Sequence, residues 1–271
     1  MKLSLNYSQA AQNLYQGKQI AFDVWKCPAW PDLVSAIQSE KAVYVHFGMD
    51  AGHPDFAHTD WNECERLLEQ TQTPYINVHL NAVREHFDGE TQAVLYRQVR
   101  DRFLANVGFM VERFGAERVI AENVIYRGEE GKFLRASVEP EMIRDIVHET
   151  GCGLLLDTAH ATMTCKHLQT SVEDYLNALP VWALREWHVT GIQADNTERL
   201  RDSMPMTPDD WRTTEYVLGQ IAQGAWPHPW AIAWEYGGVG SGYEWRSDAV
   251  VIAEQFPRLV DLVQSAGLLV V

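Results

Sequence analysis

Long apolar runs are missing from this sequence of 271 residues. No stretch approaches the roughly 20 apolar residues of a transmembrane helix. Met1-Lys2 leads directly into a short strand pattern rather than into a secretion signal. We therefore expect a cytoplasmic protein that does not enter a membrane.

Cysteine and positive charge are also scarce. The four cysteines, Cys27, Cys64, Cys152 and Cys165, show no C-x-x-C spacing, which predicts free and mostly buried thiols in a reducing compartment. Only 22 lysines and arginines stand against 37 acidic residues, and the formal net charge is −15. This acidity disfavours a nucleic-acid partner, because affinity for phosphates comes largely from lysine and arginine.

The sequence contains no linker, low-complexity segment or strong internal repeat, and a short β-rich run followed by a longer amphipathic stretch recurs instead. Eight such strands alternating with helices predict parallel β-α-β units closed into a (β/α)₈ TIM barrel, one α/β domain over residues 1–271. A doubly wound sheet is less favoured because no G-x-G-x-x-G follows the first strand. The predicted strands are Lys2–Asn6, Ile20–Trp25, Ala42–Phe47, Tyr75–Leu80, Arg118–Glu122, Gly153–Asp157, Leu184–Val189 and Trp230–Glu235.

Imidazole or carboxylate side chains lie at the ends of six consecutive predicted strands, the third to the eighth. Histidine, aspartate and glutamate make up about one residue in six, so this repetition is not expected by chance. In a TIM barrel the carboxyl ends of the strands meet at the catalytic face. The six residues are His46, His79, Glu122, Asp157, His188 and Glu235.

These residue types in this arrangement predict a metal site. Each carboxylate ends an apolar run, as Glu122 follows Val119-Ile120-Ala121, and a carboxylate there is costly to desolvate without a cation. A divalent ion would also relieve the repulsion between several carboxylates. Imidazole with carboxylate suits Zn²⁺, Fe²⁺ or Mn²⁺.

Each residue alone has a structural explanation as well. His46, His79 and His188 are each compatible with a hydrogen-bonded or packed core histidine. Asp157 is compatible with the N-cap of a following helical turn, and Glu122 with an ion pair to Arg127. The prediction of a metal site fails only if all of these structural explanations are correct.

Two further residues near the predicted strand ends are weaker candidates. Lys26 follows the second strand, where it could act as an acid or bind an anion. Asn123 follows Glu122, where it could orient that carboxylate or contact substrate.

At these residues the sequence resembles the xylose-isomerase-like barrel superfamily. The resemblance is strongest to the multinuclear non-haem iron-dependent oxidases, the group of the methanobactin-type maturation enzymes, and best over residues 119–212. Asp157-Thr158-Ala159-His160 is instead similar to the Asp-Thr-x-His of endonuclease IV. The segments that carry the resemblance to the oxidases are Thr150–Asp157, Glu122-Asn123 with Tyr126, Tyr175-Leu176 with Leu179-Pro180, and Glu186-Trp187-His188 with Gly191.

The resemblance implies a ligand set. Glu122 would bridge two metal ions, with His46 and His79 on one side and Asp157, His188 and Glu235 on the other. The catalytic set would be His160, Asp202 and Asn123, of which His160 and Asp202 remain from a third metal position. Met204 replaces the histidine of the family's Asp-x-His in that position, and a thioether is a poor ligand for such ions. We therefore expect two divalent ions, iron before zinc or manganese, and a third position that is weakened or empty.

Three functions remain open from the sequence. The resemblance implies an iron oxidase or oxygenase acting on a peptide or a small thiol-containing substrate, with a possible partner protein that presents the peptide. The alternatives are a divalent-metal sugar isomerase, epimerase or endonuclease IV-like hydrolase, and a degenerate barrel that only binds a ligand. Oxygen consumption separates the first two, and a folded protein without metal would favour the third.

Overall fold

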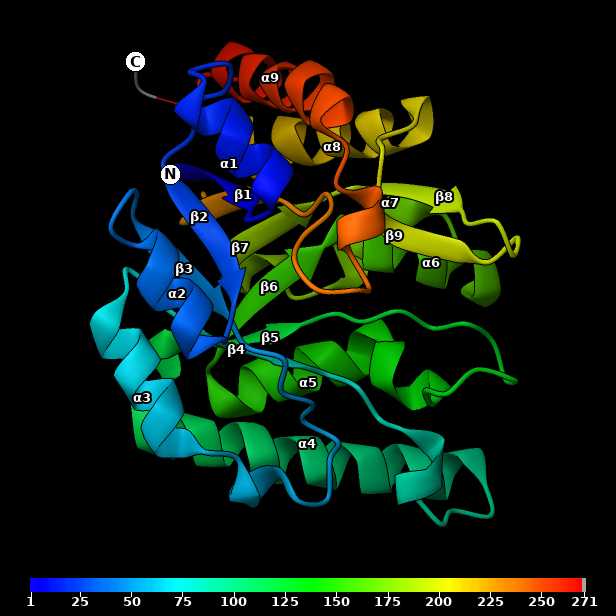
Figure 1. The fold of residues 1–271 in the computed structure, drawn as a ribbon. Coiled ribbons are helices and arrows are strands. Elements are labelled where there is room, and N and C mark those ends of the chain that lie inside the picture. The colour runs from blue at the N-terminus through cyan, green and yellow to red at the C-terminus, as the bar shows by residue number, and fades with distance from the viewer. Residues whose placement is uncertain (270–271) are drawn as a thin grey trace.

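Eight parallel strands form the centre of the molecule, and helices surround them (Figure 1). The structure is a computed structural model that describes residues 1–269. Adjacent strands follow the order β3-β2-β1-β10-β7-β6-β5-β4. They are β1 (Lys2–Asn6), β2 (Val24–Pro28), β3 (Val43–His46), β4 (Ile76–His79), β5 (Val119–Glu122), β6 (Gly153–Asp157), β7 (Leu184–Val189) and β10 (Ala231–Trp234). The fold is therefore the predicted TIM barrel in a single domain.

The first and last strands of this order, β3 and β4, are joined mainly by side chains and loop backbone. The amide of Asn77 accepts from the main-chain N–H of Phe47 at 2.7 Å and donates to its carbonyl at 3.0 Å. Two residues earlier on β3, the N–H of Val45 donates to Thr73 Oγ1 at 2.8 Å. These bonds satisfy backbone groups that a regular strand ladder would otherwise pair, so the barrel is nearly closed there.

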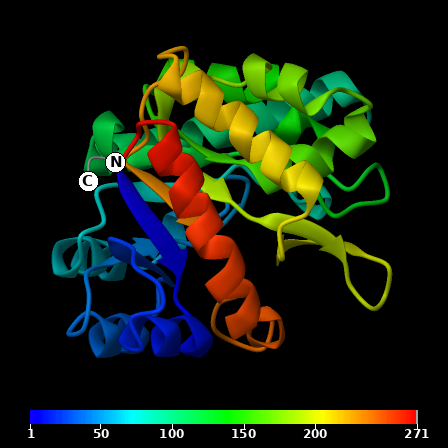
Figure 2. The same ribbon diagram turned by 90° about the horizontal axis from the view of Figure 1, so that it is seen from above.

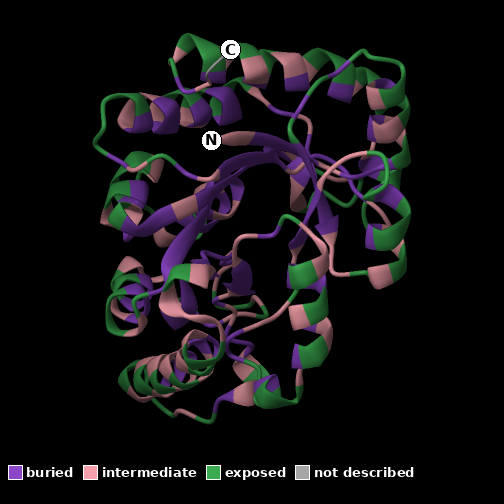
Figure 3. Cartoon of the chain, turned by 90° about the vertical axis from the view of Figure 1, so that its left-hand side faces the viewer, coloured by how far each residue is buried: buried purple, intermediate pink, exposed green. Residues whose placement is uncertain are grey.

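The helices cover the outside of the barrel with their apolar faces turned inward (Figures 1 and 3). Capping side chains define several of their starts: Ser8 Oγ accepts from Ala11 N, and Thr207 forms a capping box with Asp210. The helices are α1 (Gln9–Gln16), α2 (Pro31–Ile37), α3 (Trp61–Gln70), α4 (Gln92–Phe114), α5 (Pro140–Thr150), α6 (Thr158–Leu168), α7 (Val172–Ala178), α8 (Pro208–Ala222) and α9 (Ala249–Ser265). Over residues 1–269 none of them is long and apolar enough to cross a membrane.

An antiparallel hairpin, β8 (Gly191–Ala194) with β9 (Leu200–Met204), follows β7 directly and projects from the barrel (Figures 1 and 2). Asp195 organises its tip, since its carboxylate accepts from the N–H groups of Thr197 and Arg199 and from the side chain of Arg201. The hairpin matters because β9 returns Asp202 to the catalytic face of the barrel.

The eight predicted strands are all confirmed, with one displaced. The second strand is β2 at Val24–Pro28 rather than Ile20–Trp25. Helices α1 and α6 and the hairpin β8–β9 were not predicted. Thr207 is the N-cap of α8, and Gly151, with φ of 71°, is the C-cap of α5.

Candidate metal centre

The six imidazole and carboxylate side chains predicted at the strand ends meet at one end of the barrel. His46, His79, Glu122 and Asp157 are the last residues of β3, β4, β5 and β6. His188 is the penultimate residue of β7, and Glu235 follows β10 directly. Parallel strands bring these positions together. The structure thus places all six together, in three overlapping groups of three whose ligand atoms lie within 4.8 Å of one another.

The first group consists of His46, His79 and Glu122. Glu122 Oε2 lies 3.1 Å from His79 Nε2 and 3.5 Å from His46 Nε2, and the two Nε2 atoms are 3.3 Å apart. Burial, and then the positive charges of Lys26 and the neighbouring imidazoles, hold the pKa of His46 well below its usual range. His46 is therefore neutral at neutral pH, as a metal ligand must be.

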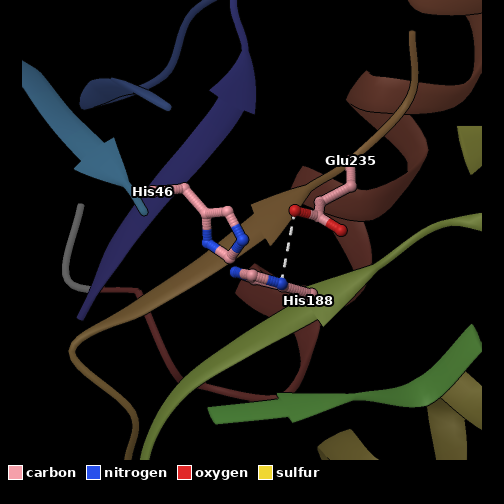
Figure 4. A group of neighbouring side chains, drawn as sticks. All are labelled: His46, His188 and Glu235. Carbon is pink, nitrogen blue, oxygen red and sulfur yellow. Dashed lines mark ion pairs between the residues drawn. The ribbon is translucent and has the colours of Figure 1, made fainter. Parts of the chain in front are cut away.

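The other two groups share His188. One joins it to Glu122 and Asp157, and the other joins it to His46 and Glu235 (Figure 4). His188 Nδ1 lies 3.3 Å from Glu235 Oε1, 3.8 Å from Glu122 Oε1 and 3.9 Å from Asp157 Oδ2. Glu122 thus belongs to two groups and offers a different oxygen to each.

Three buried atoms of this cluster have no hydrogen-bond partner among the described residues: Glu122 Oε2, Asp157 Oδ2 and His188 Nδ1. A buried polar atom without a partner costs about 1–3 kcal/mol, and more when charged. Burial, with Glu235 and Glu122 close by, raises the pKa of Asp157 to about 7. Divalent cations in the groups that share Glu122 would satisfy these atoms, so the residues present fit a metal centre.

His188 is oriented by a carboxylate behind it. Its Nε2 lies 2.7 Å from Glu186 Oε1, and that oxygen also accepts from the hydroxyl of Tyr44 at 2.9 Å. Carboxylates that hold a metal-binding histidine in this way fix which nitrogen faces the metal. Sequence reasoning missed this role of Glu186, although residues two apart on a strand share a face.

Asp157 has two roles, because it is also the N-cap of α6. Its Oδ1 accepts from His160 N at 2.8 Å, while Oδ2 faces the cluster. The structural explanation for Asp157 and the metal explanation therefore hold together. The predicted alternative for Glu122 does not apply, because Arg127 donates to the carbonyl of Leu200 instead.

His160 and Asp202 form a second pair beside the cluster, with His160 Nε2 3.3 Å from Asp202 Oδ2. Burial alone would lower the pKa of His160, but Asp157, Asp202 and Glu122 outweigh it and raise the pKa well above its usual value. Arg246 contacts Asp202 from the other side, donating to its carbonyl, with Nη1 4.0 Å from Oδ1. In the described part of the chain no three-ligand group includes Asp202. Met204, on which the expectation of a weakened or empty third position rests, is buried, and that expectation stays a prediction.

Asn123 is fully buried, and its side chain is engaged by backbone. It donates to the carbonyl of Asp157 at 2.8 Å and accepts from the N–H of the same residue at 2.8 Å. Asn123 therefore fixes the end of β6, and its direct role in catalysis stays a prediction.

The cluster opens into a cavity of about 570 Å³. Lys26, His46, His79, Glu122, His160, Asp202 and Glu235 line its polar end. The rest of the wall is largely apolar, with Trp30, Phe47, Met49, Leu67, Val239 and Tyr243. A cavity of this size and character is that of a small-molecule site.

A TIM barrel with a buried imidazole and carboxylate cluster at its catalytic face defines a metal-dependent barrel enzyme. The family model described as RiPP precursor modification enzyme MbnB/TglH/ChrH matches residues 32–226. The chain therefore belongs to that family.

The chain is also similar to other proteins and to solved structures. A UPF0276 protein of Acaryochloris marina is 22% identical over 73% of this chain and 72% of its own. Another, of Psychromonas ingrahamii, is 40% identical, but the match covers only 24% of either chain. The crystal structure of D-psicose 3-epimerase with D-tagatose from Clostridium cellulolyticum H10 covers 98% of this chain and 99% of its own at a TM-score of 0.60. Its sequence identity is 12%, so the likeness is one of fold.

Proposed function

We propose that the protein is a multinuclear non-haem iron oxidase or oxygenase that acts on a peptide or a small thiol-containing substrate. The observation that carries the proposal is the cluster of three overlapping ligand groups, two of which share Glu122, with buried atoms that a cation would satisfy. Membership of a family of peptide-modifying enzymes supports the substrate class. Imidazole and carboxylate ligands without thiolate are compatible with iron as well as with zinc and manganese, and the resemblance to the iron-dependent oxidases favours iron.

In this proposal His46 and His79 would hold one ion, and Asp157, His188 and Glu235 would hold the other. Glu122 would be a ligand shared by the two. Bound iron would supply the electron transfer that activates dioxygen.

The remaining groups prepare the site for substrate. Glu186 orients His188, and Asn123 fixes the strand end that carries Asp157. His160 holds a proton that it shares with Asp202 at the cavity wall. The apolar part of the wall excludes water from the substrate.

The cavity also bears on the size of the substrate. At about 570 Å³ it has room for a small molecule or for one or two residues of a peptide. A longer peptide would extend across the outer surface, where a partner protein could hold the part that lies outside the cavity.

The test compares the purified protein with Glu122→Gln and with the control Glu63→Gln. Glu63 lines the same cavity but belongs to none of the three ligand groups. After anaerobic loading with Fe²⁺, we expect about two irons in the parent and in Glu63→Gln, and at most one in Glu122→Gln.

Admitting oxygen then separates the possible functions. A change in visible absorption with uptake of O₂ in the parent and the control supports the oxidase. Tight binding of zinc or manganese without any response to oxygen would instead support the isomerase, epimerase or hydrolase alternative. Equal iron content in parent and Glu122→Gln would overturn the proposed centre.

A further inference from the structure

Lys26 is a buried cation at the edge of the candidate metal centre. It lies on β2, is 4% exposed and lines the cavity. Within residues 1–269 its ammonium has one hydrogen-bond partner, Glu235 Oε1. An ammonium carries three N–H donors, so Lys26 has donors left for a group inside the cavity.

The partner of Lys26 is itself a candidate metal ligand. The same oxygen, Glu235 Oε1, lies 3.3 Å from His188 Nδ1 in one of the three ligand groups. An ion bound through that oxygen would compete with Lys26 for its negative charge. A buried ammonium without a negative partner is costly. Metal binding at the centre would therefore favour the binding of an anion beside Lys26.

The rest of the cavity indicates which anion would fit. Carboxylates lie on several sides, including Glu122, Asp202, Asp60 and Glu63, and they would repel a doubly charged group such as phosphate. Among the described residues, Lys26 is the one lysine that lines the cavity. The surrounding apolar wall favours a ligand whose body is apolar or aromatic.

We propose that Lys26 binds the carboxylate of a substrate that has an apolar or aromatic body. The ammonium would hold the carboxylate beside the metal centre, and the apolar wall would hold the body. This inference rests on the proposed function, because it is the metal that competes with Lys26 for Glu235.

The experiment frees Lys26 without any metal. In the variant Glu235→Gln the lysine loses its carboxylate partner, so the metal-free protein can be titrated with 3-phenylpropanoate and with the neutral 3-phenylpropanamide. Binding is measured by calorimetry for the parent, for Glu235→Gln, and for Glu235→Gln combined with Lys26→Met, Lys26→Arg or Lys41→Met. Lys41 is a charge-matched control that lies against Tyr15 and does not line the cavity.

We expect Glu235→Gln to bind the acid about tenfold more tightly than the metal-free parent, the effect of one hydrogen bond to a charged group. Lys26→Met should abolish the gain, whereas Lys26→Arg and Lys41→Met should keep most of it. The amide should bind equally to all variants, which also shows that the cavity has remained folded.

The inference is overturned if Glu235→Gln binds the acid no better than the parent, or if Lys26→Met leaves the gain intact. Because the titrations use metal-free protein, they are independent of the metal analysis that tests the proposed centre. Failure of one proposal is thereby distinguished from failure of the other.

Discussion

At the scale of single residues, the candidate centre depends on which nitrogen of His188 faces inward. Glu186 contacts Nε2, and Tyr44 on β3 donates to the same carboxylate. All three side chains are buried, so the imidazole has little freedom to turn over. The unpartnered Nδ1 is thereby directed at Glu122, Asp157 and Glu235.

Glu186→Gln should therefore weaken metal binding without removing a ligand. We expect a fall in affinity of about 10- to 100-fold, the usual effect of losing a carboxylate behind a metal-binding histidine. Tyr44→Phe should cause a smaller loss, and the exposed Glu254→Gln none. Competition with a chromophoric chelator measures all three, and unchanged affinity in Glu186→Gln would show that the imidazole is held by packing alone.

Asp157 should make the metal-free protein less stable as the pH rises. Its pKa is raised to about 7 in the fold but is about 4 in an unfolded chain. The stabilisation from its protonated form is fully present below about pH 4 and is lost as the pH rises through about 7. Asp157→Asn, which keeps the N-cap, should thus melt about 3 °C or more above the parent at pH 8.

The difference between Asp157→Asn and the parent should shrink at pH 5. Thermal unfolding in the presence of a chelator measures it at both values. Asp60→Asn changes another N-cap aspartate, at the start of α3, and is the control for replacing a capping carboxylate. A gain of equal size at pH 5 and pH 8 would contradict the assignment to Asp157.

At the scale of elements, the hairpin β8–β9 is joined tightly to the barrel. A Cβ added at Gly191 would lie 2.1 Å from the carbonyl oxygen of Pro205, far inside contact distance. Ser203, between Asp202 and Met204, has a φ of 52° although it is not glycine, and such strain is common where a side chain must be directed at a functional site. The position of Asp202 at the cavity therefore depends on the close contact between Gly191 and Pro205 and on the strained backbone at Ser203.

Gly191→Ala should destabilise the protein by about 2 kcal/mol or more, since backbone would have to move to admit the methyl group. Gly108→Ala is the matched control within α4, where a Cβ would meet nothing within 4 Å. That change should stabilise the helix by about 0.5–1 kcal/mol. Denaturant unfolding measures both, and equal effects would contradict the close approach.

Elements that follow a strong local pattern were predictable, and those that depend on tertiary contacts were not. The buried runs of β5 and β6 read as strands because both faces are covered. The displacement of β2 arises because Ile20 and Phe22 are buried in the segment before the strand, where apolar residues imitate a strand pattern. Helix α6 was missed because it is buried on several sides and lacks a clear amphipathic period.

At the scale of the whole molecule, the candidate ligands come from six of the eight barrel strands or their ends. An ion bound there would stabilise the folded chain relative to the unfolded one, by about 2.7 kcal/mol at a metal concentration of one hundred times Kd. We expect a chelator to lower Tm and added Fe²⁺ or Mn²⁺ to restore it. Glu122→Gln should show little of either response, and a Tm indifferent to chelator in the parent would argue against a bound ion.

The composition of the cluster was predictable because a parallel barrel brings its strand ends together whatever lies between them. The surroundings of the cluster were harder to predict. Arg246 reaches Asp202 from the loop after β10, and Tyr44 reaches Glu186 from β3, so neither contact has a signature in local sequence. The ligand roles themselves stay predictions until metal is measured.

Because the barrel is only nearly closed between β3 and β4, the metal centre would also have a structural role. His46 and His79 stand at the ends of these two strands, where Asn77 and Thr73 replace a regular ladder. An ion held by both imidazoles would cross-link the first and last strands of the sheet. Amide hydrogen exchange along β3 and β4 would then slow when the metal binds. Metal binding and the closure of the barrel between these two strands would be a single event.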